Sequence, residues 1–246
     1  MSGPTHRAAP RSSFAAFAKD GAYVNEVERS VDFLNVPHEF FIRAKGEALL
    51  EIVQRHVGDP STLSFLDVGC GVGSMQRYVA AAARKSVGVD MSAESVETAR
   101  ATYPGVEFHA YSGERLPFDD GAFDVVFAVN VMHHVPPAQW PAFSQELMRV
   151  VRPGGVVCVF EHNPYNPLTR LAVFRCEFDD DAVLLTHRKL LGLLTGAGGV
   201  HEESRYILFF PFKASFTAPI ERRLKFLPLG AQHCVAVRRP LVPSGV

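Results

Sequence analysis

Residues 65–73 read Phe-Leu-Asp-Val-Gly-Cys-Gly-Val-Gly, in which an acid is followed by three glycines at every second position. The apolar run at 63–68 predicts a buried strand, and the Ala-rich stretch at 74–84 predicts a helix. Glycine allows a tight turn and lets a ligand approach the main chain closely. A strand, a glycine turn and a helix in succession are therefore typical of a nucleotide-binding turn.

The glycine spacing separates two kinds of cofactor site. A dinucleotide-binding turn follows G-x-G-x-x-G, whereas this chain has Gly69, Gly71 and Gly73 with Asp67 two residues before the first glycine. This spacing disfavours an NAD(P)-dependent oxidoreductase. It leaves open an unrelated α/β protein with a glycine-rich turn.

The composition indicates one large domain with a substantial core. The chain has 246 residues, of which 47% are apolar, and a net charge of −1, so no overall positive field favours nucleic acid. Four cysteines without a C-x-x-C pair indicate a reducing, cytoplasmic compartment. No apolar run approaches the ~20 residues of a membrane span. Residues 1–13 lack the apolar core of a signal peptide and predict a disordered leader.

Strands and helices alternate along the chain. Helices are predicted at 14–34, 38–56, 92–102 and 138–151, and strands at 63–68, 86–90, 106–110, 123–130 and 156–161. A lid-like loop at 163–178, a helix at 179–195 and strands at 206–210 and 234–237 are predicted to follow. This order predicts an α/β fold with a doubly wound, mostly parallel, seven-stranded sheet.

Polar residues follow each of the first five predicted strands. Ligands of open α/β sheets bind beyond the carboxyl ends of the strands, so these side chains are predicted to converge. Asp90 ends the second strand, where a carboxylate can accept hydrogen bonds from ribose hydroxyls. The other residues at strand ends are Ser112, Gly113 and Glu114, then Asn130, His133 and His134, and finally Glu161, His162 and Asn163.

Five segments together resemble the motifs of class I S-adenosylmethionine (SAM)-dependent methyltransferases. The glycine stretch is similar to the first motif, and 87–92 to the second. The segments 114–124, 131–135 and 147–155 resemble the "LPF-turn-FD", "LHHV" and "L-x-R-V-L-K-P-G-G" sequences of the family. The resemblance covers residues 62–162 and is nearest to small-molecule methyltransferases related to the ubiquinone/menaquinone enzymes.

The resemblance implies a Rossmann-like class I methyltransferase fold that binds SAM and its product S-adenosylhomocysteine. Asp67 and the loop 69–73, with Gly69, Cys70, Gly71 and Gly73, would hold the methionine part, and Asp90 the ribose. Met91 would flank the adenine, Ser112 and Gly113 would contact it, and Asn130 would contact the amino-acid end. In the family an acid usually stands where this chain has Ser112.

Methyl transfer to a hydroxyl, amine or acidic carbon is helped by a general base, and histidine titrates in the useful range. His134 is the first candidate, followed by His133 and His162, with Glu161 as an orienting group or alternative base. We expect no metal site, because adjacent histidines are predicted to point apart and no ligand-spaced partner is evident. The acidic run 179–181 predicts a solvated helix N-terminus.

The predicted organisation is a leader at 1–13, a helical cap at 14–60, a SAM-binding core at 61–162, and a substrate lid with the last strands at 163–246. The predicted function is methyl transfer to a small-molecule acceptor by a monomer or homodimer without nucleic acid. Three alternatives stay open: a SAM-binding protein that does not methylate, an NAD(P)-dependent oxidoreductase, and a nucleic-acid methyltransferase. The acceptor and the methylated atom, O, N or C, cannot be deduced from these residues.

Overall fold

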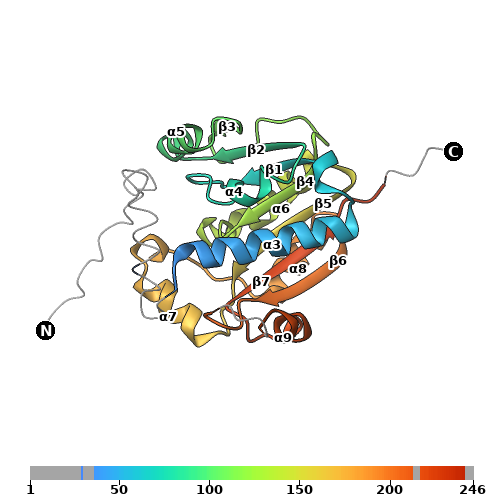
Figure 1. The fold of residues 1–246 in the computed structure, drawn as a ribbon. Coiled ribbons are helices and arrows are strands. Elements are labelled where there is room, and N and C mark those ends of the chain that lie inside the picture. Colours follow the sequence, from blue (N-terminus) through green and yellow to red (C-terminus); the bar gives the residue numbers. More distant parts are fainter. Residues whose placement is uncertain (1–28, 30–35, 213–216, 242–246) are drawn as a thin grey trace, which may run out of the picture.

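A seven-stranded sheet forms the centre of the computed structural model, which describes residues 29, 36–212 and 217–241 (Figure 1). The strand order is β3-β2-β1-β4-β5-β7-β6. Neighbours among β1 to β5 are parallel, whereas β7 is antiparallel to both β5 and β6. The strands are β1 Ser64–Val68, β2 Lys85–Asp90, β3 Glu107–Ala110, β4 Phe123–Val129, β5 Val151–His162, β6 Val200–Ile207 and β7 Gln232–Arg238. The predicted α/β fold with a mostly parallel seven-stranded sheet is confirmed.

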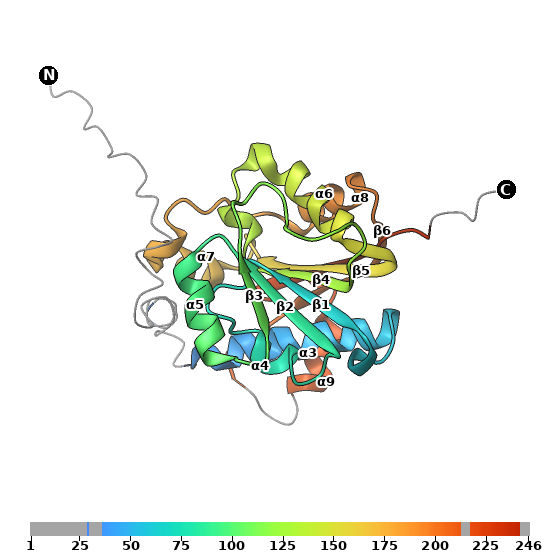
Figure 2. The same ribbon diagram turned by 90° about the horizontal axis from the view of Figure 1, so that it is seen from above.

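Helices cover both faces of the sheet. Helices α6 and α8 lie on one face and α3 and α4 on the other, as the view from above shows (Figure 2). The α-helices are α3 His38–His56, α4 Gln76–Val79, α5 Ala93–Thr102, α6 Trp140–Val150, α7 Pro167–Arg175, α8 His187–Gly196 and α9 Thr217–Leu224. Short 3₁₀ helices are η3 Pro60–Thr62, η4 Met132–His134, η5 Pro137–Gln139 and η6 Glu177–Asp179.

The central strands are apolar throughout because both of their faces are buried. Side chains alternate along a strand, so Val126 and Ala128 of β4 join the core under α6 and α8. Val125 and Phe127 join the core under α3. All four side chains are fully buried. This pattern is what a parallel sheet covered by two helical layers requires.

Several element boundaries agree with the predictions. The predicted helix at 38–56 is α3. Ser92 caps α5, since its side chain accepts a hydrogen bond from the Ser95 amide at 3.1 Å. The predicted helix at 74–84 is wrong over most of its length, because only Gln76–Val79 is helical and turns flank it. The predicted leader at 1–13 lies outside the described residues, as does all of the predicted helix at 14–34 except residue 29.

The largest difference from the predictions lies between β5 and β6. The predicted lid contains helix α7, and the predicted helix at 179–195 begins only at His187, where Thr186 provides the cap. The chain ahead of it is not helical, and the amide of Val183 donates to the carbonyl of His133 at 2.9 Å. This bond joins the segment after η6 to η4, and Asp179 of η6 lies 3.5 and 3.4 Å from His133 and His134 of η4.

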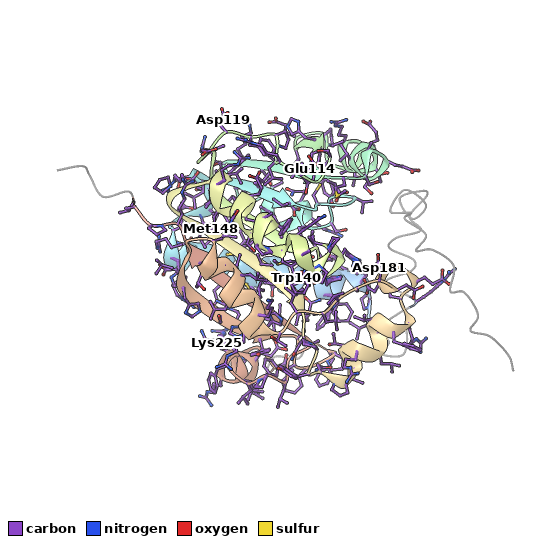
Figure 3. The ribbon with its side chains drawn as sticks, turned by 180° about the vertical axis from the view of Figure 1, so that it is seen from behind. Glu114, Asp119, Trp140, Met148, Asp181 and Lys225 are labelled. Atoms are coloured by element: carbon purple, nitrogen blue, oxygen red, sulfur yellow. The ribbon has the colours of Figure 1, made fainter. Side chains whose placement is uncertain are left out.

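The carboxyl ends of β1 to β5 share one edge of the sheet. In the view from behind, Trp140 at the start of α6 lies toward the side that carries Asp181, and Met148 lies toward the opposite side (Figure 3). The indole of Trp140 donates to the carbonyls of Met132 and Val135, at 3.0 and 2.8 Å. Helix α6 thus fixes the segment that follows β4.

Within the described residues, no helix combines the length and apolar character needed to cross a bilayer.

Candidate functional site

The glycine turn follows β1 directly, and two of its three glycines, Gly69 and Gly71, have different surroundings. The amide of Gly69 donates to the carbonyl of Val89 at 2.8 Å, which ties the turn to β2. Gly69 has a φ of +75°, and a Cβ there would lie 2.4 Å from Val131. Gly71 has a φ of +51°, and a Cβ there would meet no protein atom within 4 Å. The turn is therefore packed closely at Gly69 and faces open space at Gly71.

Two buried acidic side chains, Asp67 and Asp90, lie next to this turn. Asp90 ends β2 and accepts hydrogen bonds from the amides of Gly71 and Ser92, each at 2.8 Å. Asp67 in β1 accepts a hydrogen bond from the Gln76 amide group at 3.0 Å. Burial raises the pKa of Asp90, and burial raises the pKa of Asp67 to about 8. Asp90 is thus hydrogen-bonded to the glycine turn itself, and Asp67 to the first residue of helix α4 just beyond the turn.

The ends of β2 and β3 meet beside the turn. Met91 has 63% of its surface exposed, and a Cβ added to Gly113 would lie 2.7 Å from the Met91 methyl group. Ser112 is also exposed. Cys70 is buried with its thiol 3.6 Å from the Gly71 carbonyl, which it faces as a donor. Met91 and Gly113 therefore lie side by side at the ends of β2 and β3, and the adenine contacts predicted for them and for Ser112 stay a prediction.

Asn130 follows β4 in the left-handed backbone region, with a φ of +56°. The backbone N–H of Asn130 donates to the Phe160 carbonyl at 2.9 Å. Its side-chain Oδ1 is buried and has no hydrogen-bond partner among the described residues. A buried acceptor without a donor is costly, so this position favours a ligand that supplies an N–H or O–H.

Beyond Asn130, the residues of η4 meet Glu161 and Asp179. The imidazole of His133 donates from Nδ1 to Glu161 Oε2 at 2.6 Å, and Glu161 Oε1 accepts from the Met132 amide at 2.7 Å. Nε2 of His133 lies 3.5 Å from Asp179 Oδ1, and Nε2 of His134 lies 3.4 Å from the same oxygen. His133, His134, Glu161 and Asp179 are called the histidine–carboxylate cluster below.

This arrangement corrects two expectations. The imidazoles of His133 and His134 do not point apart, since their centroids are 4.1 Å from each other and both Nε2 atoms face Asp179. Asp179 is not part of a solvated helix N-terminus, because α8 begins only at His187 and the side chain of Asp179 is only 11% exposed. No residue close to Asp179 in the sequence signals this position, since the contact joins two segments that lie far apart along the chain.

The charges in the cluster give the histidines different protonation states. Burial opposes a charge on His133, but Glu161 and Asp179 outweigh burial and raise the pKa of His133 to about 10. Burial, and after it the charge of His133, lower the pKa of His134 to about 4. The charge and hydrogen bond of His133 hold the pKa of Glu161 below its usual value in spite of burial. At neutral pH His133 is a cation between two anions, and His134 is neutral.

His162 and Lys45 complete the surroundings of the cluster. The His162 ring lies 5.1 Å from the His133 ring, and burial lowers the pKa of His162 to about 3. Lys45 of α3 is buried, and burial lowers its pKa to about 8 although the Glu161 charge favours the ammonium. Lys45 was not predicted as a site residue. An isolated lysine within an amphipathic helix carries no sequence signal for such a position.

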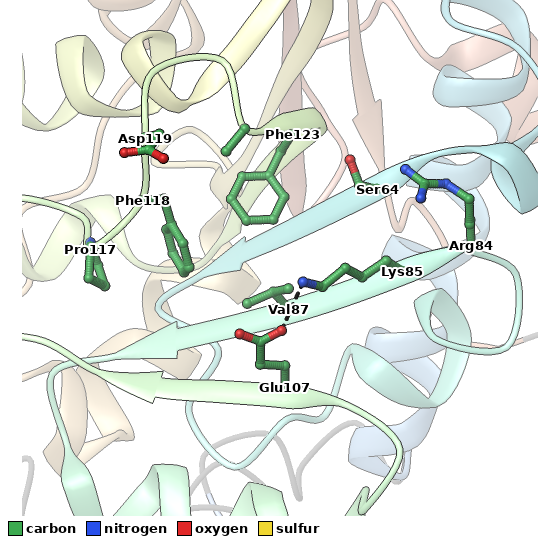
Figure 4. Close-up of a pocket in the computed structure, with 10 residues that line it drawn as sticks. Ser64, Arg84, Lys85, Val87, Glu107, Pro117, Phe118, Asp119 and Phe123 are labelled. Atoms are coloured by element: carbon green, nitrogen blue, oxygen red, sulfur yellow. Dashed lines mark ion pairs between the residues drawn. The ribbon is translucent and has the colours of Figure 1, made fainter.

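A separate pocket of about 350 Å³ opens at the amino ends of the strands, away from the glycine turn (Figure 4). Its lining includes Arg84, Lys85, Glu107 and Phe118, and an ion pair joins Lys85 to Glu107 at 2.8 Å. Ligands of open α/β sheets bind at the other end of the strands. The candidate site is therefore the carboxyl edge rather than this pocket.

Comparison with known proteins identifies the central segment. Residues 66–159 match the family model described as "Methyltransferase domain". An uncharacterized methyltransferase of Synechocystis sp. is 33% identical over 137 residues, which are 54% of this chain and 65% of that protein. The 2-methyl-6-phytyl-1,4-hydroquinone methyltransferase of Synechocystis sp. is 38% identical over 108 residues, 42% of this chain and 33% of that protein. The match therefore spans less than two thirds of each of these relatives.

Solved structures share the fold over nearly the whole chain. A Thermotoga maritima SAM-dependent methyltransferase, titled a possible histamine N-methyltransferase, has a TM-score of 0.64 and 22% identity and covers 92% of this chain and 99% of its own. The [4+2]-cyclase SpnF has a TM-score of 0.59 and 18% identity and covers 81% of this chain and 83% of its own. The resemblance to class I SAM-dependent methyltransferases and the Rossmann-like fold are confirmed.

Proposed function

We propose that this chain, whose residues 66–159 match the family model described as "Methyltransferase domain", transfers the methyl group of SAM to an O, N or C atom of a small-molecule acceptor. The observation that carries the proposal is the unpartnered, buried Oδ1 of Asn130 at the carboxyl edge. The α-ammonium group of SAM offers N–H donors that fit such an acceptor. The open space at Gly71 and the Asp90 carboxylate lie on the same edge.

The residues along the edge fit the parts of SAM in order. The turn 69–73 and Asp67 would hold the methionine part, Asp90 the ribose, and Met91 with residues 112–113 the adenine. When bound, the sulfonium supplies an activated methyl group, so the protein has to align the acceptor and exclude water. The cluster beyond Asn130 is then on the side toward which the methyl group is passed.

The histidine–carboxylate cluster is proposed to take up the proton that the acceptor loses. His134 is proposed as the proton acceptor, because its imidazole is neutral at physiological pH, whereas His133 is already protonated. Glu161 fixes the ring of His133 through the 2.6 Å hydrogen bond. Glu161, engaged in this hydrogen bond, and His162, whose pKa burial lowers to about 3, are less suited to accept the proton.

An acceptor with an apolar part agrees with the surface of α7. Leu168, Leu171 and Phe174 of this helix are exposed, the last by 85%, and Tyr165 before it is also exposed. A relative named for a phytyl hydroquinone acts on a molecule of that kind. We therefore propose a quinone-like, lipid-like or natural-product acceptor.

Titration calorimetry with SAM, S-adenosylhomocysteine and NAD tests the cofactor. We expect the chain to bind both SAM and S-adenosylhomocysteine and to show no preference for NAD, because the glycine spacing leaves a single-nucleoside site. Tight binding of NAD with no heat from SAM would contradict the proposal.

Replacement of Asp90 tests the ribose contact. Asp90→Ala removes two charge-assisted hydrogen bonds, each worth roughly 1.5–3 kcal/mol, so SAM affinity should fall at least about tenfold. Asp119→Ala is the matched control, because Asp119 lies at the pocket on the opposite edge (Figure 4). Circular dichroism checks that both variants fold. Equal SAM affinity in the two variants would exclude Asp90 from the site.

The alternative is a SAM-binding protein that does not methylate. A [4+2]-cyclase shares this fold, and the residues of the glycine turn and Asp90 argue only for binding. Methyl transfer releases S-adenosylhomocysteine, whereas SAM binding alone does not. Release of S-adenosylhomocysteine in the presence of a mixture of phenolic, quinol and amine acceptors favours methyl transfer, and tight SAM binding without any release favours the alternative.

A further inference from the structure

Three ligand-type atoms from two distant segments meet beyond the end of β4. His133, His134 and Asp179 contribute one atom each, and the three atoms lie within 4.8 Å of one another. The two histidines belong to η4, and Asp179 ends η6. A hydrogen bond between the backbones of Val183 and His133 fixes the two segments relative to each other.

The distances suit an ion better than direct hydrogen bonds. The two N···O separations are 3.5 and 3.4 Å, longer than the ~2.7–3.2 Å of a well-formed N–H···O bond. Ligands at about 2.0–2.1 Å from a tetrahedral Zn²⁺ lie roughly 3.3–3.4 Å apart. The two N···O separations therefore match two edges of a tetrahedral ligand set, and the third pair of atoms lies within 4.8 Å.

The groups behind the ligands have the arrangement that metal sites use. A metal-bound histidine commonly donates its other N–H to a carboxylate, which fixes its tautomer and orientation. His133 does so to Glu161 at 2.6 Å, and both of these side chains are almost fully buried. Nδ1 of His134 lies 3.9 Å from the carboxylate of Asp181, on the side away from Asp179.

We propose that His133, His134 and Asp179 bind one first-row divalent cation of the Zn²⁺ type. Two imidazoles and one carboxylate suit such an ion and do not suit Mg²⁺ or Ca²⁺, which prefer oxygen ligands. Three protein ligands leave a fourth position open, as in catalytic zinc sites. In the absence of the ion, a proton on His133 balances the charges of Glu161 and Asp179.

The catalytic role of this ion rests on the proposed methyl transfer and takes the place of His134 as the group that promotes loss of the acceptor's proton. A hydroxyl acceptor bound at the fourth position would lose its proton to solvent more readily, because the cation stabilises the resulting oxyanion. The oxygen would then form the O–CH₃ bond while the S–CH₃ bond breaks and its electron pair stays on sulfur. In this form of the site, His134 acts as a ligand and the cation replaces it in removing the proton.

Metal binding can be measured without the acceptor. The untagged full chain, first dialysed against a chelator, is titrated with ZnCl₂ by calorimetry, and CoCl₂ is added separately to record visible absorption bands of tetrahedral Co²⁺. We expect one Zn²⁺ per chain and intense Co²⁺ bands. Asp179→Asn should weaken Zn²⁺ binding at least tenfold, and Glu161→Gln should weaken it by roughly 10–100-fold.

Asp180→Asn is the matched control, since this exposed neighbour changes the same charge one residue away and should leave Zn²⁺ affinity unchanged. If Glu161→Gln does not fold, the pair at 179 and 180 still decides. The absence of Zn²⁺ binding, or equal affinity in Asp179→Asn and Asp180→Asn, would overturn the inference. SAM titrated into the same samples keeps the two proposals apart, because retained SAM binding without Zn²⁺ binding rejects the metal site alone.

Discussion

His134→Ala is expected to lower methyl transfer by about 10²–10⁴-fold, the usual worth of a positioned proton acceptor. The imidazole is neutral because burial and the charge of His133 lower its pKa to about 4, so it can receive a proton from the acceptor. SAM affinity should stay nearly unchanged, since the ring lies beyond Asn130 and outside the glycine turn. Turnover with a confirmed acceptor and calorimetry with SAM measure the two effects separately.

The control for this variant is His201→Ala, because His201 is an exposed histidine on β6 that bonds only to Ser204 among the described contacts. His133→Ala is a poor control, since it would leave the charge of Glu161 buried without its partner. A structure with S-adenosylhomocysteine offers a second test, in which an imidazole should lie within about 6 Å of the sulfur, with room for one acceptor atom at roughly 3–3.5 Å. Full activity of His134→Ala, or a ring turned into the helix packing, would contradict the assignment.

The parts of the fold that local sequence determines were predicted well. The continuous apolar run of β4 and the cap at Ser92 depend on neighbours within a few residues, and both are found as expected. The glycine turn likewise follows from three residues whose φ angles are all positive. Because strand ends of a parallel sheet lie at one edge, the convergence of Asp90, Asn130 and Glu161 on that edge could also be predicted.

Long-range contacts account for what the sequence could not show. The acidic run 179–181 has the composition of a helix start. Nothing in this run indicates that Asp179 contacts His133 and His134, although His134 precedes it by 45 residues (179 − 134). The hydrogen bond between the backbones of Val183 and His133 joins the same two segments. The roles of the site residues in cofactor binding and catalysis stay predictions, which the variants described here test.

Gly71→Ala is expected to weaken SAM binding by roughly 5- to 150-fold while the chain still folds. A Cβ at this position meets no protein atom within 4 Å, so the free protein loses only about 1–2 kcal/mol for an alanine in the left-handed region. If the open space is the cofactor site, the new methyl group collides with the methionine part of SAM. Overpacking of that kind costs about 1–3 kcal/mol. As a loss of binding free energy, this corresponds to the roughly 5- to 150-fold weaker SAM binding.

Gly198→Ala is the matched control for this loss. Gly198 also has a positive φ, of +94°, and open space around its Cβ position, but it lies between α8 and β6. It should cost at least as much stability as Gly71→Ala in urea unfolding and leave SAM affinity unchanged. Gly69→Ala cannot serve, because its Cβ would lie 2.4 Å from Val131 and disturb the turn itself. Equal SAM affinity in the variants at 71 and 198 would mean that the cofactor does not lie over Gly71, and the glycine turn would then be structural only.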